Sequence, residues 1–282
     1  MKVIYNEILN KVGRIIKYNI RIPEDNSSVP LIIFSHGFKG FRNWSFIPYV
    51  CSKFSDSGFI SLNLDFSMNG IIDDEKQIYD DSVFRKNTVS SEIADLICLI
   101  EYLKENRENA EYLKNWNSEI ILVGHSLGGA VSILTSEKLN DVKGIVLWAS
   151  ISKLDRNTQR QKDLWKEIGF VEIEIPITGQ KLHLDYTYIE DKDNNIGVDA
   201  IHKALLKMDT PILIIHPETD MTVSIKEAYE IKSTASKYKI RDLIVIPKSG
   251  HTFNCRHPFE GANAGLDIAI ESTIKFVNSL YE

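Results

Sequence analysis

Residues 120–128 read Ile-Ile-Leu-Val-Gly-His-Ser-Leu-Gly, which places Ser126 between Gly124 and Gly128 directly behind an apolar run. The run predicts a buried strand, and the small residues that follow from Gly129 predict a helix packed closely on a sheet. G-x-S-x-G between a strand and a helix is the pattern of a nucleophile elbow, a sharp turn that exposes the serine hydroxyl. Glycine at 124 and 128 avoids side-chain collisions across such a turn. The stretch therefore predicts an α/β fold with Ser126 as a nucleophile at a strand end.

Short apolar runs alternate with helical patterns along the rest of the chain. Residues 12–22 predict an antiparallel edge strand, and buried strands are predicted over 31–35, 59–65, 120–123, 143–149, 211–216 and 241–246. Helices are predicted over 43–57, 89–106, 129–139, 224–235 and 264–280. This alternation predicts a mostly parallel, doubly wound sheet covered by helices on both faces. Ligands of such sheets bind beyond the carboxyl ends of the strands.

Length and composition favour one large domain. The 282 residues are 43% hydrophobic, and no linker or repeat divides them, so we expect a single domain over 1–282 with an insertion at 151–208. A net charge of −6 without a basic cluster argues against a nucleic-acid partner. The chain has no apolar stretch of membrane-spanning length, no signal-peptide pattern and three scattered cysteines. We therefore expect a cytoplasmic protein with no metal and no membrane partner.

A serine nucleophile requires a histidine base and an acid that orients the histidine. Among seven histidines, His251 is preferred because it follows the last predicted strand on a loop that can reach the elbow. Asp220 is preferred as the acid because it follows the strand 211–216 by a short turn. Glu218, two residues earlier, is the alternative acid. Asp65 is a weaker candidate, which we interpret as a turn residue near the rim of the sheet.

Two backbone N–H groups are needed to stabilise the oxyanion of an acyl-transfer reaction. One is expected from Leu127, at the start of the elbow helix, where the helix dipole also favours negative charge. The other is expected from the loop after the strand 31–35, which reads His36-Gly37-Phe38. Gly37 allows this loop to turn over the site, and the N–H of Phe38 is our choice.

Taken together, these motifs resemble the α/β-hydrolase superfamily over nearly the full length of the chain, because Ser, Asp and His occur in the order of that superfamily. The motifs are His36-Gly37-Phe38, Gly124-His125-Ser126-Leu127-Gly128, Asp220 and Ser249-Gly250-His251. Within the superfamily the chain is similar to bacterial esterases near the dienelactone hydrolases, the prolyl-oligopeptidase-like hydrolases and the serine-type feruloyl or cinnamoyl esterases. Dienelactone hydrolases proper use a cysteine nucleophile, and this chain has Ser126. The resemblance implies an α/β-hydrolase fold and an acyl-enzyme mechanism without a cofactor.

The insertion at 151–208 carries the pattern of a β-hairpin. Apolar residues alternate before and after a turn that contains Gly179, and Pro176 indicates an edge strand. We expect this hairpin, with a helix, to form a small cap over Ser126 that supplies an apolar pocket and excludes water. The alternative is that its aromatic residues bury only the core of the insertion itself. The candidate pocket residues are His36, Gly37, Trp165, Phe170, Tyr186 and Tyr188.

These features favour a serine carboxylic-ester hydrolase of the EC 3.1.1 type that acts on small soluble esters, feruloyl, cinnamoyl or short acyl esters among them. One alternative is a serine peptidase or aminoacyl hydrolase of the same fold, for which we identify no charged anchor for a peptide terminus. A second alternative is a non-catalytic ligand-binding protein on a hydrolase fold. Such proteins usually lose a triad residue, and this chain retains candidates for all three. The sequence makes no prediction of the oligomeric state.

Overall fold

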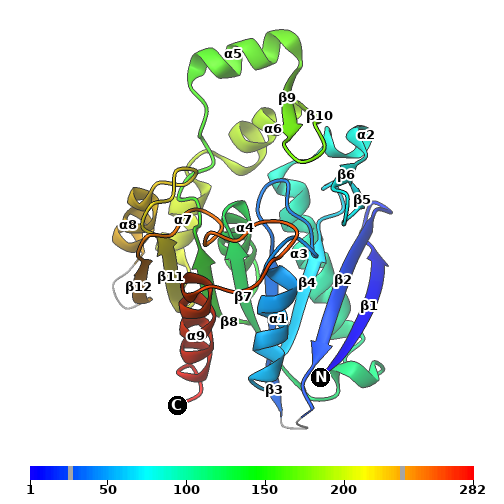
Figure 1. Ribbon diagram of the computed structural model, residues 1–282, viewed down its shortest axis with the longest axis vertical. Helices are drawn as coiled ribbons and strands as arrows, with labels where there is room; N and C mark the ends of the chain where they lie inside the picture. Colours follow the sequence, from blue (N-terminus) through cyan, green and yellow to red (C-terminus); the bar gives the residue numbers. More distant parts are fainter. Residues whose placement is uncertain (25–27, 236–238) are drawn as a thin grey trace.

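The centre of the molecule is an eight-stranded sheet with the strand order β1-β2-β4-β3-β7-β8-β11-β12 (Figure 1). The computed structural model describes residues 1–24, 28–235 and 239–282. The strands from β4 to β12 in this order run parallel to one another. β2 pairs antiparallel with β4, and β1 pairs antiparallel with β2. The bounds are β1 (Lys2–Leu9), β2 (Ile15–Ile22), β3 (Val29–Ser35), β4 (Ile60–Asp65), β7 (Trp116–His125), β8 (Val142–Trp148), β11 (Ile212–Pro217) and β12 (Ile240–Ile246). The parallel strands therefore end at one common edge of the sheet.

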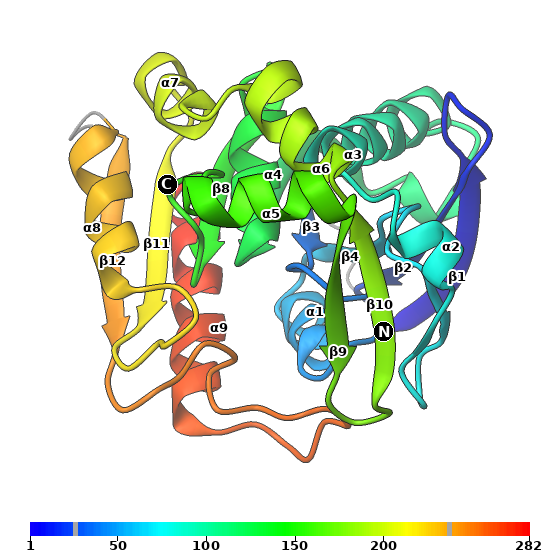
Figure 2. The same cartoon turned by 90° about the horizontal axis from the view of Figure 1, so that it is seen from above.

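Helices cover both faces of the sheet, as the strand pattern predicted (Figure 2). One face carries α1 (Ile47–Asp56) and α9 (Ala264–Asn278), and the other carries α3 (Val89–Glu105), α4 (Leu127–Ser136) and α8 (Ile225–Thr234). On β3, Ile32 and Phe34 pack in the core under α1 and α9. Leu31 and Ile33 of the same strand pack in the core under α3, α4 and α8. Both faces of the strand are thus buried, which explains its continuous apolar run. A short 3₁₀ turn, η1 (Glu111–Leu113), precedes β7.

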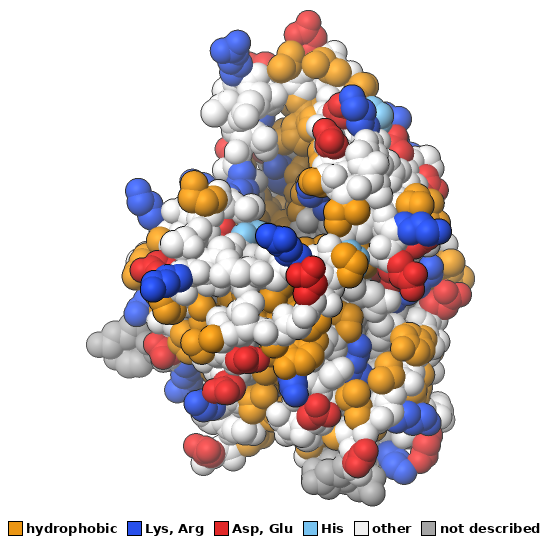
Figure 3. All heavy atoms as spheres, viewed as in Figure 1, with side chains coloured by type: hydrophobic (Ala, Val, Ile, Leu, Met, Phe, Trp, Pro, Cys, Tyr) orange, Lys and Arg blue, Asp and Glu red, His pale blue; other side chains and the backbone are white. Residues whose placement is uncertain are grey.

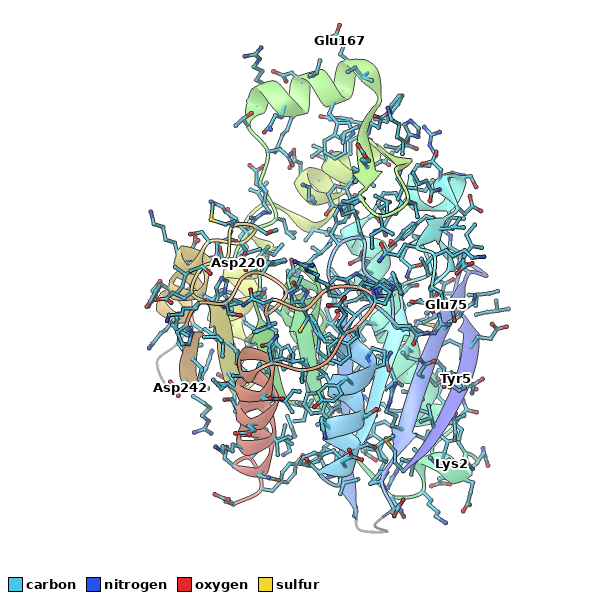
Figure 4. All side chains as sticks on the ribbon, in the orientation of Figure 1. Lys2, Tyr5, Glu75, Glu167, Asp220 and Asp242 are labelled. Atoms are coloured by element: carbon cyan, nitrogen blue, oxygen red, sulfur yellow. The ribbon has the colours of Figure 1, made fainter. Side chains whose placement is uncertain are left out.

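The edge of the sheet differs from the expectation drawn from residues 12–22. The strand found there, β2, lies inside the sheet between β1 and β4, and β1 forms the edge. The prediction missed β1 because only part of one face of this strand is buried. Ile8 lies in the core, whereas Tyr5 and Leu9 are 73% and 66% exposed. Lys2 and Tyr5 on β1 lie far from Asp220, which is found near the carboxyl ends of the parallel strands (Figure 4).

The predicted helix over 43–57 begins later, at Ile47. Residues before it form two successive turns, with the N–H of Trp44 bonded to the carbonyl of Phe41 and the N–H of Ile47 bonded to the carbonyl of Trp44. Pro48 lies in the first turn of α1, where its missing N–H costs no helical hydrogen bond. Trp44 therefore lies in a turn before α1 and not in the helix itself.

A cap rises above the carboxyl ends of the strands (Figure 1). It consists of α5 (Gln159–Ile168), the hairpin β9 (Phe170–Ile175) and β10 (Gln180–Asp185), α6 (Thr187–Glu190) and the π-helical turn η2 (Asp191–Ile196). The hairpin confirms the alternating pattern, with Ile173 opposite Leu182. The expected edge-strand position of Pro176 was wrong, because Pro176 lies in the hairpin turn. The second strand ends at Asp185, so Tyr186 precedes α6 as its N-cap and Tyr188 lies within α6. The helix that ends the insertion, α7 (Ala200–Lys207), packs on α4 and α8 instead of on the cap.

A second segment, without a periodic pattern in the sequence, holds the hairpin in place. It contains β5 (Ile71–Asp73), β6 (Ile78–Tyr79) and α2 (Asp81–Phe84). The side chain of Gln180 bonds both backbone groups of Tyr79, accepting from its N–H at 2.9 Å and donating to its carbonyl at 2.6 Å. Arg85 donates to Asp185 through Nε at 3.0 Å and Nη2 at 2.7 Å. We call residues 78–85 the clamp.

The described residues contain no helix that is both long and apolar enough to cross a bilayer.

Candidate active site

Ser126 lies at the turn between β7 and α4, with φ 55° and ψ −118°. A positive φ is strained for a residue with a Cβ atom, so the surrounding structure must hold the serine in place. A Cβ on Gly124 would lie 2.2 Å from the carbonyl oxygen of Gly128, which is the collision across the turn that the motif predicts. A Cβ on Gly128 would instead lie 2.3 Å from the carbonyl oxygen of Ser35. The second glycine is thus required by the neighbouring loop.

The structure brings His251 and Asp220 together. Nδ1 of His251 lies 2.7 Å from Oδ2 of Asp220, and Oδ1 of Asp220 accepts hydrogen bonds from the N–H groups of Thr222 and Val223, both at 2.8 Å. Burial acts to raise the pKa of Asp220, but the bonds from His251 and from these backbone groups outweigh it and lower the pKa. Asp220 is therefore an ionised acceptor that fixes the tautomer of His251.

The two other acids that the sequence offered lie elsewhere. Glu218 is exposed and accepts a hydrogen bond from the N–H of Lys248 at 3.0 Å. Asp65 pairs with the guanidinium of Arg42 and accepts from the N–H of that residue at 2.6 Å. Neither carboxylate contacts His251, so Asp220 is the acid that the geometry selects.

Two buried histidines flank the Asp220–His251 pair. Nε2 of His125 donates to the carbonyl oxygen of His251 at 3.0 Å, and burial, together with the nearby His251, lowers the pKa of His125 to about 3. Nε2 of His216 donates to the carbonyl oxygen of Val223 at 2.9 Å and lies 3.7 Å from Oδ2 of Asp220. Burial also lowers the pKa of His216. Both rings stay neutral at physiological pH and act as hydrogen-bond donors of fixed geometry.

The loop after β3 lies against the elbow. A Cβ on Gly37 would lie 3.0 Å from Cβ of Ser126 and 3.1 Å from the carbonyl oxygen of His125. Phe38, the next residue, lines the same cavity as Ser126, while Leu127 directly follows the serine and begins α4. The ring of Phe38 packs against Phe84 of α2 and Tyr188 of the cap, with centroids 5.8 Å and 6.0 Å apart. The two residues proposed to supply the N–H groups of an oxyanion hole therefore belong to the loop that contacts the elbow and to the first turn of α4.

A cavity of about 220 Å³ opens next to Ser126. Its lining combines the elbow, the His251 loop, the loop after β3, the clamp and the end of the hairpin. The lining residues are His36, Gly37, Phe38, Lys39, Gly40, Trp44, Ile47, Gln77, Tyr79, His125, Ser126, Ile175, Pro176, His251 and Thr252. The insertion therefore reaches the site through Ile175 and Pro176. Figure 3 shows the surface hollowed between the cap and the body, with hydrophobic side chains inside.

Of the six candidate pocket residues, His36 and Gly37 line the cavity, whereas Trp165, Phe170, Tyr186 and Tyr188 do not. The indole of Trp165 stacks on Tyr188 at 6.2 Å and donates from Nε1 to the carbonyl of Leu184. Phe170 packs on His183, with a centroid distance of 4.7 Å. Trp165, Tyr186 and Tyr188 belong to a hydrophobic cluster that the cap shares with Phe41 and Phe84 of the body, so they pack the cap onto the body and not only the insertion itself.

Several lining residues were not predicted from the sequence, namely Lys39, Trp44, Gln77, Tyr79, Ile175 and Pro176. Lys39 directly follows the motif residues His36-Gly37-Phe38, so its position gave a usable signal. Gln77 and Tyr79 gave none, because they reach the cavity through tertiary contacts of a segment without periodicity. Within the described residues, His, Cys, Asp and Glu form no cluster that could hold a metal ion.

A comparison with known protein families identifies the family of this chain. A model of the dienelactone hydrolase family matches residues 17–172, which is more than half of the chain. The chain belongs to the dienelactone hydrolase family. The matched part of this dienelactone hydrolase family member contains Ser126 and the loop after β3, and it ends before Asp220 and His251. Family membership makes the protein a hydrolase, while the roles of its acid and base rest on the geometry described above.

The relatives of this dienelactone hydrolase family member are distant. It is 24% identical over 244 residues to an uncharacterized 31.7 kDa protein of Escherichia coli from the traX-finO intergenic region, across 84% of this chain and 78% of that protein. Its fold is similar to Est1E from Butyrivibrio proteoclasticus with bound ferulic acid, at a TM-score of 0.71, 17% identity and 99% coverage of both chains. It is also similar to dienelactone hydrolase from Anabaena variabilis, at a TM-score of 0.62, 17% identity and coverage of 98% and 97%. These similarities confirm the α/β-hydrolase fold.

Proposed function

We propose that this chain is a serine carboxylic-ester hydrolase that works through an acyl-enzyme on small soluble esters. The observation that carries the proposal is the 2.7 Å contact between His251 and Asp220 at the rim of the cavity that contains Ser126. A charged acid, a histidine and a strained, cavity-facing serine are the components of a nucleophilic triad. The strained backbone of Ser126 adds support, since such strain concentrates at functional sites.

The chemistry follows from the positions of these groups. Oγ of Ser126 attacks the ester carbonyl carbon, and Nε2 of His251 accepts the proton of the hydroxyl. Asp220 holds the Nδ1–H of His251 and stabilises the imidazolium that forms. The N–H groups of Phe38 and Leu127 stabilise the oxyanion, and His251 then returns the proton to the leaving alcohol. Water, activated by His251, hydrolyses the acyl-enzyme and regenerates Ser126.

The shape of the cavity favours a small acyl group. A volume of about 220 Å³, bounded by Trp44, Tyr79 and Ile175, suits a short aliphatic or a single aromatic acyl group. Est1E, which has a similar fold, has been solved with ferulic acid bound, and this supports hydroxycinnamoyl esters as candidates beside short acyl esters. The clamp and the hairpin shield the bound ester from water on one side, which strengthens electrostatic interactions with the oxyanion.

The test compares wild-type protein with Ser126→Ala on p-nitrophenyl butyrate, methyl ferulate and an aminoacyl p-nitroanilide. We expect ester hydrolysis that falls by several orders of magnitude in the variant, with unchanged circular dichroism. A fluorophosphonate probe should label the wild-type protein at Ser126 and leave the variant unlabelled. Faster cleavage of the anilide than of the esters would point to a peptidase, and absence of both hydrolysis and labelling would point to a ligand-binding protein.

A further inference from the structure

Two polar side chains in the Ser126 cavity are left without partners. Lys39 and Gln77 both line the cavity, and among residues 1–24, 28–235 and 239–282 neither side chain forms an ion pair or a hydrogen bond. Gln77 is only 7% exposed, and Lys39 is half-buried. The amide of Gln77 and the ammonium of Lys39 are not fully buried, so the polar ends of both side chains remain open to the space that they line. Both side chains are therefore available to a substrate bound next to Ser126.

Both residues are also held in a backbone conformation that favours glycine. Lys39 has φ 62° and Gln77 has φ 53°. Lys39 occupies the third position of a turn closed by a hydrogen bond from the N–H of Gly40 to the carbonyl of Gly37, where glycine is the usual residue. The hydroxyl of Tyr79 donates to the carbonyl of Lys39 at 2.9 Å and fixes this turn. Backbone strain at two residues that line the same cavity points to a functional reason for their side chains.

The charge balance of the cavity is positive. Its lining contains no Asp or Glu, and Lys39 is the lysine among the lining residues. Burial lowers the pKa of His36 to about 4 and the pKa of His125 to about 3, so both rings are neutral at pH 7. Burial also lowers the pKa of Lys39, and no carboxylate among the described residues opposes that shift. Asp220 is already bonded to His251 and to two backbone N–H groups.

We propose that Lys39 binds a carboxylate group carried by the ester substrate, with the amide of Gln77 as a second donor. The enzyme thereby prefers esters with one negative charge over neutral esters of the same shape. A single cation matches a monoanion, whereas a phosphate dianion would leave excess negative charge in a partly desolvated cavity. This inference rests on the proposed ester hydrolysis at Ser126, and it names the substrate class of that site.

The experiment compares esters that differ only in charge. For the acyl half, monomethyl glutarate is compared with methyl 5-methylhexanoate, in which an isopropyl group replaces the carboxylate. For the alcohol half, 4-acetoxybenzoate is compared with 4-isopropylphenyl acetate. A pH-stat measures kcat and KM for wild-type protein, Lys39→Met, Lys39→Arg, Gln77→Leu and the control Lys166→Met, which changes an exposed lysine on α5.

We expect the wild-type protein to prefer the carboxylate ester in at least one pair. Lys39→Met should lower kcat/KM for that ester by about tenfold to a hundredfold, as expected for loss of a hydrogen bond to a charged group, and mainly through KM. Lys39→Arg should restore part of the preference, Gln77→Leu should reduce it less, and Lys166→Met should retain it. The pair that shows the effect identifies the half of the substrate that carries the carboxylate.

The inference is overturned if the wild-type protein shows no preference in either pair, or if Lys39→Met retains it. Labelling of Ser126 by a fluorophosphonate checks that Lys39→Met is folded with an active nucleophile. Neutral esters that are hydrolysed with dependence on Ser126 but without dependence on Lys39 would refute the inference alone. If none of the esters is hydrolysed, the proposed function itself fails.

Discussion

The ring of His125 donates a hydrogen bond from Nε2 to the main-chain carbonyl oxygen of His251 over 3.0 Å. This bond joins the turn at Ser126 directly to the loop that carries His251, the proposed base, and the two imidazole centroids are 4.8 Å apart. Because burial lowers the pKa of His125 to about 3, its ring remains neutral and keeps the same donor across the pH range of the reaction. The residue before the proposed nucleophile therefore holds the loop of the proposed base in place.

Replacing His125 by Phe tests this positioning role. The variant removes the donor and leaves a partly buried carbonyl without this partner, which costs about 1–3 kcal/mol. We expect kcat/KM on a neutral ester to fall roughly tenfold or more, since 1.4 kcal/mol corresponds to a factor of ten. His202→Gln, on the exposed side of α7, is the matched control and should retain full activity. Wild-type kinetics in His125→Phe would show that the loop of His251 is held by other contacts.

Asp220 and Glu218 provide a direct test of the assignment of the acid. Asp220→Asn keeps the shape of the side chain but allows the wrong tautomer of His251, so kcat should fall by about 10⁴-fold. Glu218→Gln alters an exposed carboxylate two residues away and should leave the kinetics nearly unchanged. Steady-state rates on p-nitrophenyl butyrate distinguish the two variants. The reverse order of effects would assign the role to Glu218.

Glu92 on α3 predicts a loss of stability at alkaline pH. Burial raises the pKa of Glu92 to about 8, Asn87 opposes the shift through a hydrogen bond, and Asp95 and Asp191 add to it. The folded protein therefore binds this proton more tightly than the unfolded chain does. The contribution of Glu92 to stability is complete below a pH of about 4.5, the usual pKa of a glutamate, and it is lost as the pH rises to about 8.

Thermal unfolding of Glu92→Gln between pH 5 and 9 measures this contribution. The variant cannot ionise, so its free energy of unfolding should fall less than that of the wild-type protein, by up to about 1.4 kcal/mol per pH unit within the titration range. Its Tm should therefore fall less as the pH rises. Glu105→Gln, an exposed position on the same helix, is the control and should follow the wild-type curve. Parallel Tm curves for Glu92→Gln and wild type would exclude the shifted pKa.

Gln180 connects the hairpin to the clamp. Gln180→Ala would leave the N–H and carbonyl of Tyr79 without partners, and Tyr79 is 4% exposed. We expect a loss of about 1–3 kcal/mol of stability and a higher KM, because Tyr79 and Ile175 both line the cavity. Denaturant unfolding and ester kinetics measure the two effects, with Gln159→Ala on the exposed start of α5 as the control. An unchanged KM would show that the clamp does not shape the cavity.

The sequence predicted those parts of the molecule whose signal is local. The central strands are continuous apolar runs because both of their faces are buried, and the candidate triad follows from strands that all end at one edge. The edge strand β1 was missed because Tyr5 and Leu9 are exposed on it. The cavity was predicted poorly because its walls depend on pairs about a hundred residues apart, such as Tyr79 with Gln180. No periodicity in either segment indicates that pairing.

The contact between Gly128 and the loop after β3 has a consequence for how this site can vary. The backbone of α4 approaches the Ser35 carbonyl so closely that a single methyl group on residue 128 would lie 2.3 Å from its oxygen. Leu127 and Phe38, which supply the two N–H groups of the proposed oxyanion hole, lie on the two segments that meet at this contact. Main-chain atoms set the spacing between them, and no change of side-chain rotamer can adjust it. Substrate range can therefore change through the cap and the clamp while the spacing of the oxyanion donors stays constant.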